Sequence, residues 1–291
     1  MKAFQVDFTA TERVLLRDAL KSYGISKRTL ASVKYSGGHL LVNGSEVTVR
    51  HPLEIGDAVT VVFPKEANGK GLTPEKGPLS IVYEDEALLI VEKPSGQNTI
   101  PSRDQPLGSL ANFVAGHFER HGVPSTLHIA TRLDKDTSGL VCIAKNRHIH
   151  HLLSMQQQEK RMNRGYEALV HGEVAEKKAT ITAPIGRKEG SIIEREVRAD
   201  GKFAETEMKL VETITGASHI RLKLNTGRTH QIRVHMAHIG HPLLGDDLYG
   251  GGVDVIARQA LHCTELQLDH PITGERMAFS SALAEDMQRL I

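Results

Sequence analysis

The stretch TRLDKDTSGL, residues 131–140, places a carboxylate, Asp134, between an arginine and a small polar turn, with apolar segments on both sides. An acid in that position forms a turn, binds a metal ion or acts as a catalyst. Asp134 and the small polar residues after it are of the types that form an Asx turn before a strand. Calcium binding is disfavoured, because no third carboxylate stands nearby at calcium-loop spacing. Ser138 does not lie in a nucleophile-elbow motif, G-x-S-x-G, because Asp136 stands where that motif has its first glycine.

The chain around this stretch alternates between apolar strands and amphipathic helices. Residues 140–146 predict a strand and residues 147–162 a helix. Further strands are predicted on both sides of the turn at 84–86 and over 166–174, 179–186, 194–201, 204–213 and 219–227. Further helices are predicted over 109–122 and 229–240. The last helix has Thr229 as its N-cap and ends at Gly240. Most connections are short, which favours antiparallel pairing. The predicted fold class is α+β, with a mixed, mainly antiparallel sheet.

The N-terminal part, residues 1–63, has a different pattern. Helices are predicted over residues 12–22 and 26–36, with Ser26 as N-cap of the second. A hairpin follows around Asn43-Gly44, and the part closes with another strand. These elements predict a compact α/β module that is too small to hold much core.

Between the two parts, residues 64–78 read PKEANGKGLTPEKGP, which combines proline, glycine and charge without apolar periodicity. Such a composition predicts a linker. The sequence therefore predicts an N-terminal domain over residues 1–63, a linker over 64–78 and a larger domain over 79–291.

The net charge of the whole chain is only +1, yet basic residues gather in the N-terminal module. Between Arg13 and Lys34 there is one acid, Asp18, against six basic residues, Arg13, Arg17, Lys21, Lys27, Arg28 and Lys34. A local excess of positive charge indicates binding to the phosphates of a nucleic acid.

The composition is that of an ordinary soluble globular protein, with 40% hydrophobic and 24% charged residues. The apolar runs are far shorter than the roughly 20 residues that span a bilayer, and the N-terminus lacks a signal-peptide pattern. We therefore expect a cytoplasmic protein without a membrane segment, and a monomer. Cys142 and Cys263 are the only cysteines and indicate neither a disulfide framework nor a zinc site.

Sixteen histidines is a high count, and His230, His235, His238 and His241 cluster on the last predicted helix and its exit. His235 and His238 are three positions apart and could share a face. No H-E-x-x-H motif and no nearby cysteine accompany them, so structural or RNA-facing roles are favoured over a metal site. The glycines at 250–252 lack a surrounding strand–GxGxxG–helix unit. The sequence predicts neither a metal ion nor another cofactor.

Two further residues are candidates for a site. Arg228 precedes the last predicted helix, where free backbone N–H groups and the positive end of the helix dipole favour an anion, either a phosphate or an internal carboxylate. Tyr166 opens a predicted strand, where tyrosine is a common residue on a half-buried face.

Taken together and in this order, five segments closely resemble the pseudouridine synthases of the RluA/RluD type. The matching segments are EDEALLIVEKPSG (84–96), RLDKDTSGL (132–140), GYEALVHG (165–172), TGRTHQIRVHMAHIGHPLLGDDLYGG (226–251) and ALHCTELQLDHPITGE (260–275). Residues 1–63 resemble the S4-type RNA-binding module that is often fused to these enzymes. The resemblance covers essentially the whole chain.

The resemblance implies an enzyme that isomerises uridine in structured ribosomal or transfer RNA, by breaking the N1–C1′ bond and rejoining the uracil through C5. It implies that Asp134 is the catalytic carboxylate. Attack on the sugar carbon, attack on the base and assistance in removing the C2′ proton all remain open roles for it. By resemblance, Arg228 is the cation that keeps Asp134 ionised, and Tyr166 is the ring that stacks on the target base. Arg132 corresponds to the guanidinium that enters the RNA stack when the uridine flips out, although a surface ion pair is an alternative role.

The chain departs from the family at Thr131, since histidine usually precedes R-L-D there. We interpret this as a subfamily variation that affects RNA contacts. It is also the only support for an alternative function, a non-catalytic RNA-binding or ribosome-assembly factor. A third hypothesis, a metal-dependent hydrolase built on the histidine-rich helix, predicts sensitivity to a chelator.

Overall fold

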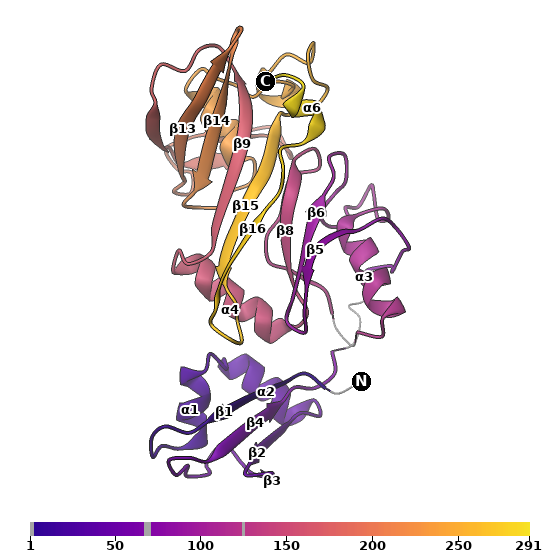
Figure 1. Cartoon of the computed structure of the whole chain (residues 1–291), viewed down its shortest axis with the longest axis vertical. Helices are drawn as coiled ribbons and strands as arrows, with labels where there is room; N and C mark the ends of the chain where they lie inside the picture. Colours follow the sequence, from indigo (N-terminus) through magenta and orange to yellow (C-terminus); the bar gives the residue numbers. More distant parts are fainter. Residues whose placement is uncertain (1–2, 67–70, 124–125) are drawn as a thin grey trace.

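The structure is a computed structural model that describes residues 3–66, 71–123 and 126–291 (Figure 1). Its strands form one sheet of four strands, one of ten and a separate pair. The two largest clusters of buried apolar residues are distinct, one ending at Phe63 and the other beginning at Ala87. The two clusters belong to an N-terminal unit and a larger unit, and the exact division at residues 63 and 79 stays a prediction.

The N-terminal unit contains β1 (Gln5–Thr9), α1 (Leu16–Ser22), α2 (Lys27–Tyr35), β2 (His39–Val42), β3 (Ser45–Glu46) and β4 (Ala58–Val62). Its antiparallel sheet has the order β1-β4-β2-β3. The sequence does not predict β1. Helix α1 begins at Leu16 and not at residue 12 as predicted, because Leu15 is extended and forms a β-bridge with Pro52.

Two local predictions in this unit are confirmed. The hydroxyl of Ser26 accepts a hydrogen bond from the Thr29 backbone N–H at 3.1 Å and so caps α2. Asn43 and Gly44 have φ angles of 49° and 80°, the left-handed conformation that a two-residue hairpin turn requires.

The larger unit contains β5 (Ser80–Glu84), β6 (Leu88–Lys93), α3 (Leu110–Arg120), β7 (His128–Ile129), β8 (Ser138–Ala144), α4 (Arg147–Gln158), β9 (Asn163–His171), β10 (Lys178–Thr182), β11 (Ile185–Arg187), β12 (Arg195–Val197), β13 (Glu205–Ile214), β14 (Ala217–Leu224), α5 (Gln231–His238), the 3-10 helix η1 (Asp247–Tyr249), β15 (Leu261–Asp269), β16 (Arg276–Ser280) and α6 (Glu285–Gln288). The main path of the sheet is β10-β13-β14-β9-β15-β8-β6-β5, with β16 beside β15 and β7 beside β8. β15 and β8 pair parallel and the other pairs are antiparallel. The prediction of an α+β fold with a mixed, mainly antiparallel sheet is confirmed.

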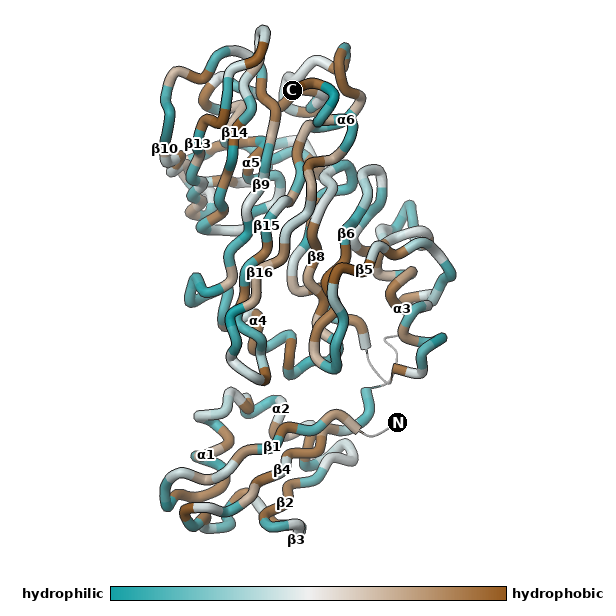
Figure 2. The backbone as a smooth tube through the Cα atoms, in the orientation of Figure 1, coloured by the Kyte–Doolittle hydropathy of each residue, from teal (hydrophilic) through white to brown (hydrophobic). Residues whose placement is uncertain are grey.

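Strand β8 lies at the centre of the apolar core, and all seven of its residues are buried. Helix α3 contributes Val114 and Phe118 to the same cluster, and α4 contributes Ile149 and Leu153. The hydropathy colouring in Figure 2 shows this concentration of apolar residues along β6 and β8. None of the helices within the described residues has the length and apolar character needed to cross a membrane.

The predictions miss β15, although it joins β9 to β8 in the middle of the sheet. A β-bulge between Cys263 and Glu265 interrupts the alternation of apolar residues along this strand. The extra residue breaks the period of two by which a strand is recognised in a sequence.

The predicted linker, residues 64–78, contains no helix or strand among its described residues, and residues 67–70 lie outside them. Its second half lies against the start of α3, where the Glu75 backbone N–H donates to the Asn112 carbonyl at 2.9 Å. Its first half reaches α4, because Glu66 Oε1 accepts from the Arg147 backbone N–H at 2.7 Å and Oε2 lies 2.8 Å from His128 Nε2.

Helix α4 also contacts the N-terminal unit, as its position between that unit and the large sheet in Figure 1 indicates. The ring of Phe63 stacks on His148, with centroids 4.9 Å apart and an interplanar angle of 22°. One helical turn further on, Leu152 Cδ2 lies 2.5 Å from where a Cβ on Gly24 would stand. The N-terminal unit therefore packs on the same helix whose far end borders the cavity described below.

Gly139, in the stretch TRLDKDTSGL, allows the parallel pairing of β8 with β15. It has a φ of +109° and lies opposite Cys263 in the register. A Cβ at this position would lie 2.3 Å from the Cys263 carbonyl oxygen and 2.6 Å from the Cys263 nitrogen. No side chain fits between the two backbones, so the loop that carries Asp134 enters β8 only through a glycine.

We predict that Gly139→Ala lowers the free energy of unfolding by about 3 kcal/mol or more, because the backbone must move at the centre of the sheet as well as adopt an unfavourable φ. Gly190→Ala is the matched control, since Gly190 has a φ of +75° but open space around its missing Cβ. Its cost is about 1–2 kcal/mol, from backbone strain alone. Urea unfolding of the two variants measures the difference. Equal losses of unfolding free energy would contradict the close approach of the Gly139 and Cys263 backbones.

Candidate active site

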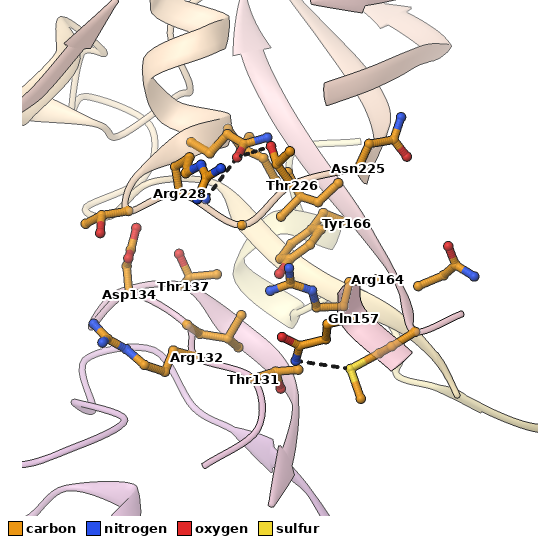
Figure 3. A pocket seen from close by; sticks show the side chains of 18 of the residues that line it. Thr131, Arg132, Asp134, Thr137, Gln157, Arg164, Tyr166, Asn225, Thr226 and Arg228 are labelled. Carbon is orange, nitrogen blue, oxygen red and sulfur yellow. Dashed lines mark hydrogen bonds between the residues drawn. The ribbon is translucent and has the colours of Figure 1, made fainter. Parts of the chain in front are cut away.

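A cavity of about 720 Å³ opens where the loop before β8, the end of α4, the start of β9 and the loop before α5 meet (Figure 3). Four residues predicted for the site, Arg132, Asp134, Tyr166 and Arg228, line it. The six basic residues of the N-terminal unit do not belong to its lining. A volume of this size is in the range that holds a small-molecule ligand.

The loop that carries Asp134 is held through its backbone carbonyls by side chains from residues 93–99. The Thr99 hydroxyl donates to the Leu133 carbonyl at 2.7 Å, and Ser95 donates to the carbonyl of Asp136 at 3.1 Å. Between these two bonds, Lys93 Nζ donates to the Lys135 carbonyl at 2.9 Å. These bonds place the Asp134 side chain at the cavity wall.

Lys93 is fully buried, and its ammonium also donates to the carbonyls of Pro94 and Gln97, at 2.7 and 2.8 Å. Burial lowers the pKa of Lys93 to about 7, while Asp136 and Asp134 act in the opposite direction. The motif EKPSG therefore acts here as a scaffold for the aspartate loop, and Lys93 itself does not line the cavity.

The cation beside Asp134 is Arg233, whose Nη1 lies 3.6 Å from Asp134 Oδ2. Arg233 is buried in the first turn of α5, and its guanidinium forms two hydrogen bonds of 2.7 Å to the fully buried Asp246. His230 Nε2 lies 4.0 Å from the same Asp134 oxygen. The carboxylate itself is 29% exposed, so it has charged partners on one side and access to the cavity on the other.

The pairing expected between Arg228 and Asp134 is not present among the described residues. Arg228 is exposed on the cavity rim, and its Nε donates to the Phe203 carbonyl at 2.9 Å. The predicted N-cap of α5, Thr229, is also wrong, because His230 occupies that position and the helix begins at Gln231. The arginine of this motif that lies beside Asp134 is Arg233. The role expected for Arg228 stays a prediction.

Tyr166 lies on β9 at the cavity wall, between Leu222 of β14 and Cys263 of β15 in the register. It is only 4% exposed, and burial raises the pKa of its phenol. Figure 3 shows its ring facing the cavity beside Arg164. Tyr166 is therefore a neutral aromatic surface at neutral pH.

Arg132 and Thr131 differ in what they contact. The Arg132 side chain is exposed and has no hydrogen-bond or ion-pair partner in the described part of the chain. Thr131 is buried, and its hydroxyl accepts from the Cys142 backbone N–H at 2.8 Å. Thr131 thus ties the loop before β8 to the backbone of that strand.

Sequence reasoning missed several polar residues of the lining, and among them are Arg233, Arg164, Lys160, Gln157 and Asn225. Arg233 lies in the segment 226–251 that was already singled out in the sequence. Its position close to the start of the predicted helix is the signal that could have identified it. The others come from the end of α4, the start of β9 and the loop after β14, and only the fold brings these segments together.

The histidines of the last helix do not form a metal site. His235 is buried, with Nδ1 2.9 Å from the Thr206 hydroxyl and Nε2 2.9 Å from the Ala183 carbonyl. Within residues 3–66, 71–123 and 126–291, no group of three or more His, Cys, Asp or Glu side chains is arranged to hold a metal ion.

Comparisons with known proteins agree on one family. The sequence profile of RNA pseudouridylate synthase matches residues 87–238. An uncharacterized RNA pseudouridine synthase of Bacillus subtilis, YjbO, is 47% identical over 92% of this chain and 95% of its own length. Ribosomal large subunit pseudouridine synthase D of Pseudomonas aeruginosa is 39% identical over 87% of this chain and 83% of its own. The solved structure of human RNA pseudouridylate synthase domain containing 1 is 28% identical, with a TM-score of 0.58 over 72% of this chain and 86% of its own.

We predict that Asp246→Asn lowers the free energy of unfolding by about 3 kcal/mol or more, because it leaves the buried Arg233 guanidinium without its main counter-charge. The control is Asp247→Asn at the exposed neighbouring position, which should change stability by less than about 0.5 kcal/mol. Urea unfolding measures both. A loss in Asp246→Asn as small as in the control would contradict the importance of this pair.

Proposed function

The chain belongs to the RNA pseudouridylate synthase family of isomerases, and on this premise we propose that it converts specific uridines of structured RNA to pseudouridine with Asp134 as the catalytic carboxylate. The reaction breaks the N1–C1′ bond, turns the uracil and rejoins it through C5, with no net change in composition or oxidation state. The observation that carries the proposal is the position of Asp134, a carboxylate in a cavity of about 720 Å³ beside a buried arginine.

The geometry leaves the Asp134 carboxylate available to a bound nucleotide. Arg233 stabilises the carboxylate by its charge. Because the guanidinium is already bonded at 2.7 Å to Asp246, Asp134 stays at 3.6 Å and is not held in a tight ion pair. A carboxylate in this state can act on the nucleotide as nucleophile or as base.

Two residues fit the handling of the flipped base. Tyr166 offers a neutral ring at the cavity wall on which the uracil can stack. Arg132 has an exposed guanidinium free of partners among the described residues, and it can fill the gap that the uridine leaves in the RNA stack. Extraction of a base costs a few kcal/mol, and stacking of a guanidinium offsets part of that cost.

The proposed substrate is structured RNA, and large-subunit ribosomal RNA is the first candidate, because the name of the Pseudomonas relative assigns it to that subunit. Transfer RNA is the second candidate. The N-terminal unit acts as an S4-like module that binds phosphates through its exposed basic side chains.

We predict that the enzyme releases tritium from RNA labelled at uridine C5, and that Asp134→Asn abolishes the release. C5 loses its hydrogen only when the base is rejoined through that carbon, so the assay reports isomerisation and not binding. Asp136→Asn is the matched control, since this carboxylate lies two positions away and does not line the cavity. Release by the wild type is expected to be unaffected by a chelator.

Two outcomes would overturn this assignment. Equal release by Asp134→Asn and the wild type would exclude Asp134 as the catalyst. Absence of release from both ribosomal and transfer RNA, with RNA binding intact, would favour a non-catalytic binding factor.

We further predict that neutralising the basic helices of the N-terminal unit weakens RNA binding more than catalysis. Arg13 and Arg17 already have acidic partners, Glu54 at 2.7 Å and Asp18 at 3.6 Å. The other four, which have no ion pair among the described residues, are Lys21, Lys27, Arg28 and Lys34.

Changing these four to glutamine should lower the slope of log affinity against log salt by about 0.7–0.9 for each RNA phosphate that the variant no longer neutralises. Arg13→Gln is the control and should have a smaller effect. These changes are preferable to deletion of residues 1–63, which would also uncover His148 and Leu152 of α4. An unchanged salt slope would refute the role assigned to this unit.

A further inference from the structure

The cavity contains a histidine whose backbone is strained. His230 lines it with a side chain that is 12% exposed. Its φ of 56° and ψ of 21° lie in the left-handed region, without a side-chain cap for the helix that follows. A residue with a Cβ adopts this conformation at an energetic cost, and persists in it where the surrounding structure determines its position. The contacts of the His230 ring therefore indicate what holds this residue in the left-handed conformation.

The ring is held by Tyr249. The Tyr249 oxygen lies 2.7 Å from His230 Nδ1 and accepts a hydrogen bond from the backbone N–H of Arg195 at 2.9 Å. An amide N–H can only donate, so the hydroxyl hydrogen of Tyr249 remains available for Nδ1. Burial raises the pKa of the Tyr249 phenol, so that hydrogen is retained at neutral pH.

A histidine that accepts at Nδ1 carries its ring proton on Nε2. Burial lowers the pKa of His230, with Arg233 and Arg195 acting in the same direction and Asp134 and Asp246 opposing them. The ring is therefore neutral, and in this tautomer its Nε2–H would face Asp134 Oδ2. The present 4.0 Å is too long for a hydrogen bond, but contacts of this kind tighten when a substrate fills the site.

One turn supports both groups that face Asp134. Asp246 holds Arg233, and Tyr249, three residues later, holds His230. The Tyr249 ring lies 4.9 Å below the Arg233 guanidinium carbon and meets the His230 ring edge-on, at 5.7 Å and 80°. His230 and Arg233 both approach Oδ2 of Asp134. The other oxygen, Oδ1, accepts no hydrogen bond within the described part of the chain.

We propose that Tyr249 and His230 form a neutral hydrogen-bonded pair that, together with Arg233, holds Oδ2 of Asp134 and directs Oδ1 toward the bound nucleotide. His230 and Tyr249 are then positioning residues that act through Asp134, and the inference rests on the function proposed for that carboxylate. Because the pair is neutral, it orients Asp134 without adding a second positive charge that would hold the carboxylate in a tight ion pair.

The first experiment reads the tautomer of His230 in the free protein and does not depend on activity. Nitrogen-15 spectra of histidine-labelled protein report which ring nitrogen carries a proton. His230→Asn assigns the signal, since asparagine tolerates the left-handed conformation. The expected result at pH 7 is a neutral ring with its proton on Nε2, and a shifted Nδ1 signal in Tyr249→Phe. A proton on Nδ1, or a doubly protonated ring, would overturn the proposal.

The second experiment measures C5 tritium release by Tyr249→Phe, which keeps the ring below Arg233 and removes only the hydroxyl. We expect kcat to fall about tenfold or more, with KM within about twofold, because the Tyr249 hydroxyl serves the reacting carboxylate and not RNA binding. Tyr83→Phe is the control, because its hydroxyl donates to Asp85 at 2.7 Å and lies outside the cavity lining. It should leave kcat unchanged.

A kcat for Tyr249→Phe within about twofold of the wild type would also overturn the proposal. If the wild type releases no tritium from any RNA, the proposed function fails. The nitrogen-15 measurement of the His230 tautomer then tests by itself whether the Tyr249–His230 pair is arranged toward Asp134 as described. The two failures are therefore distinguishable.

Discussion

The buried ammonium of Lys93 is the interaction on which the arrangement of the site depends. It donates to three backbone carbonyls, two within its own turn and one, that of Lys135, in the loop that carries Asp134. A buried charge is tolerated only when its hydrogen bonds are satisfied. The hydrogen bonds that satisfy the buried lysine therefore also fix the loop that carries Asp134. This loop forms part of the cavity wall.

Around that fixed loop, the charges are distributed so that one carboxylate stays available. Arg233 is neutralised by Asp246 at 2.7 Å and reaches Asp134 only at 3.6 Å. The helix that carries Arg233 begins after a residue in the left-handed conformation, His230, whose ring is anchored on Tyr249. Strain in the backbone and a buried ion pair are both costly, and here both serve the position of one side chain.

Helix α4 links this site to the N-terminal unit. Its first turns contact that unit through His148 and Leu152, and its last residues, with Gln157 among them, line the cavity. Glu66, in the connecting segment, accepts from the backbone N–H at the start of the same helix. Under the proposed function, α4 thus connects the RNA-binding unit to the cavity.

Local features were predictable from the sequence because each depends on neighbours along the chain. The turn at Asn43-Gly44 needs two left-handed residues, and the cap at Ser26 needs a hydroxyl three residues before a free N–H. Asp134 and Tyr166 could be singled out because they stand in motifs, and the fold places both on one cavity.

Other features depended on contacts that no local pattern encodes. Arg228 and Arg233 carry the same side chain in one motif, and only the fold shows that Arg233 is the one beside Asp134. Strand β15 was hidden because a bulge interrupts its alternation, although it pairs with three neighbours in the sheet. The sequence by itself determined which residue types could perform the chemistry. The tertiary structure decided which of them touch, because side-chain distances are set by strand register and helix start, and these depend on packing between segments far apart in the chain.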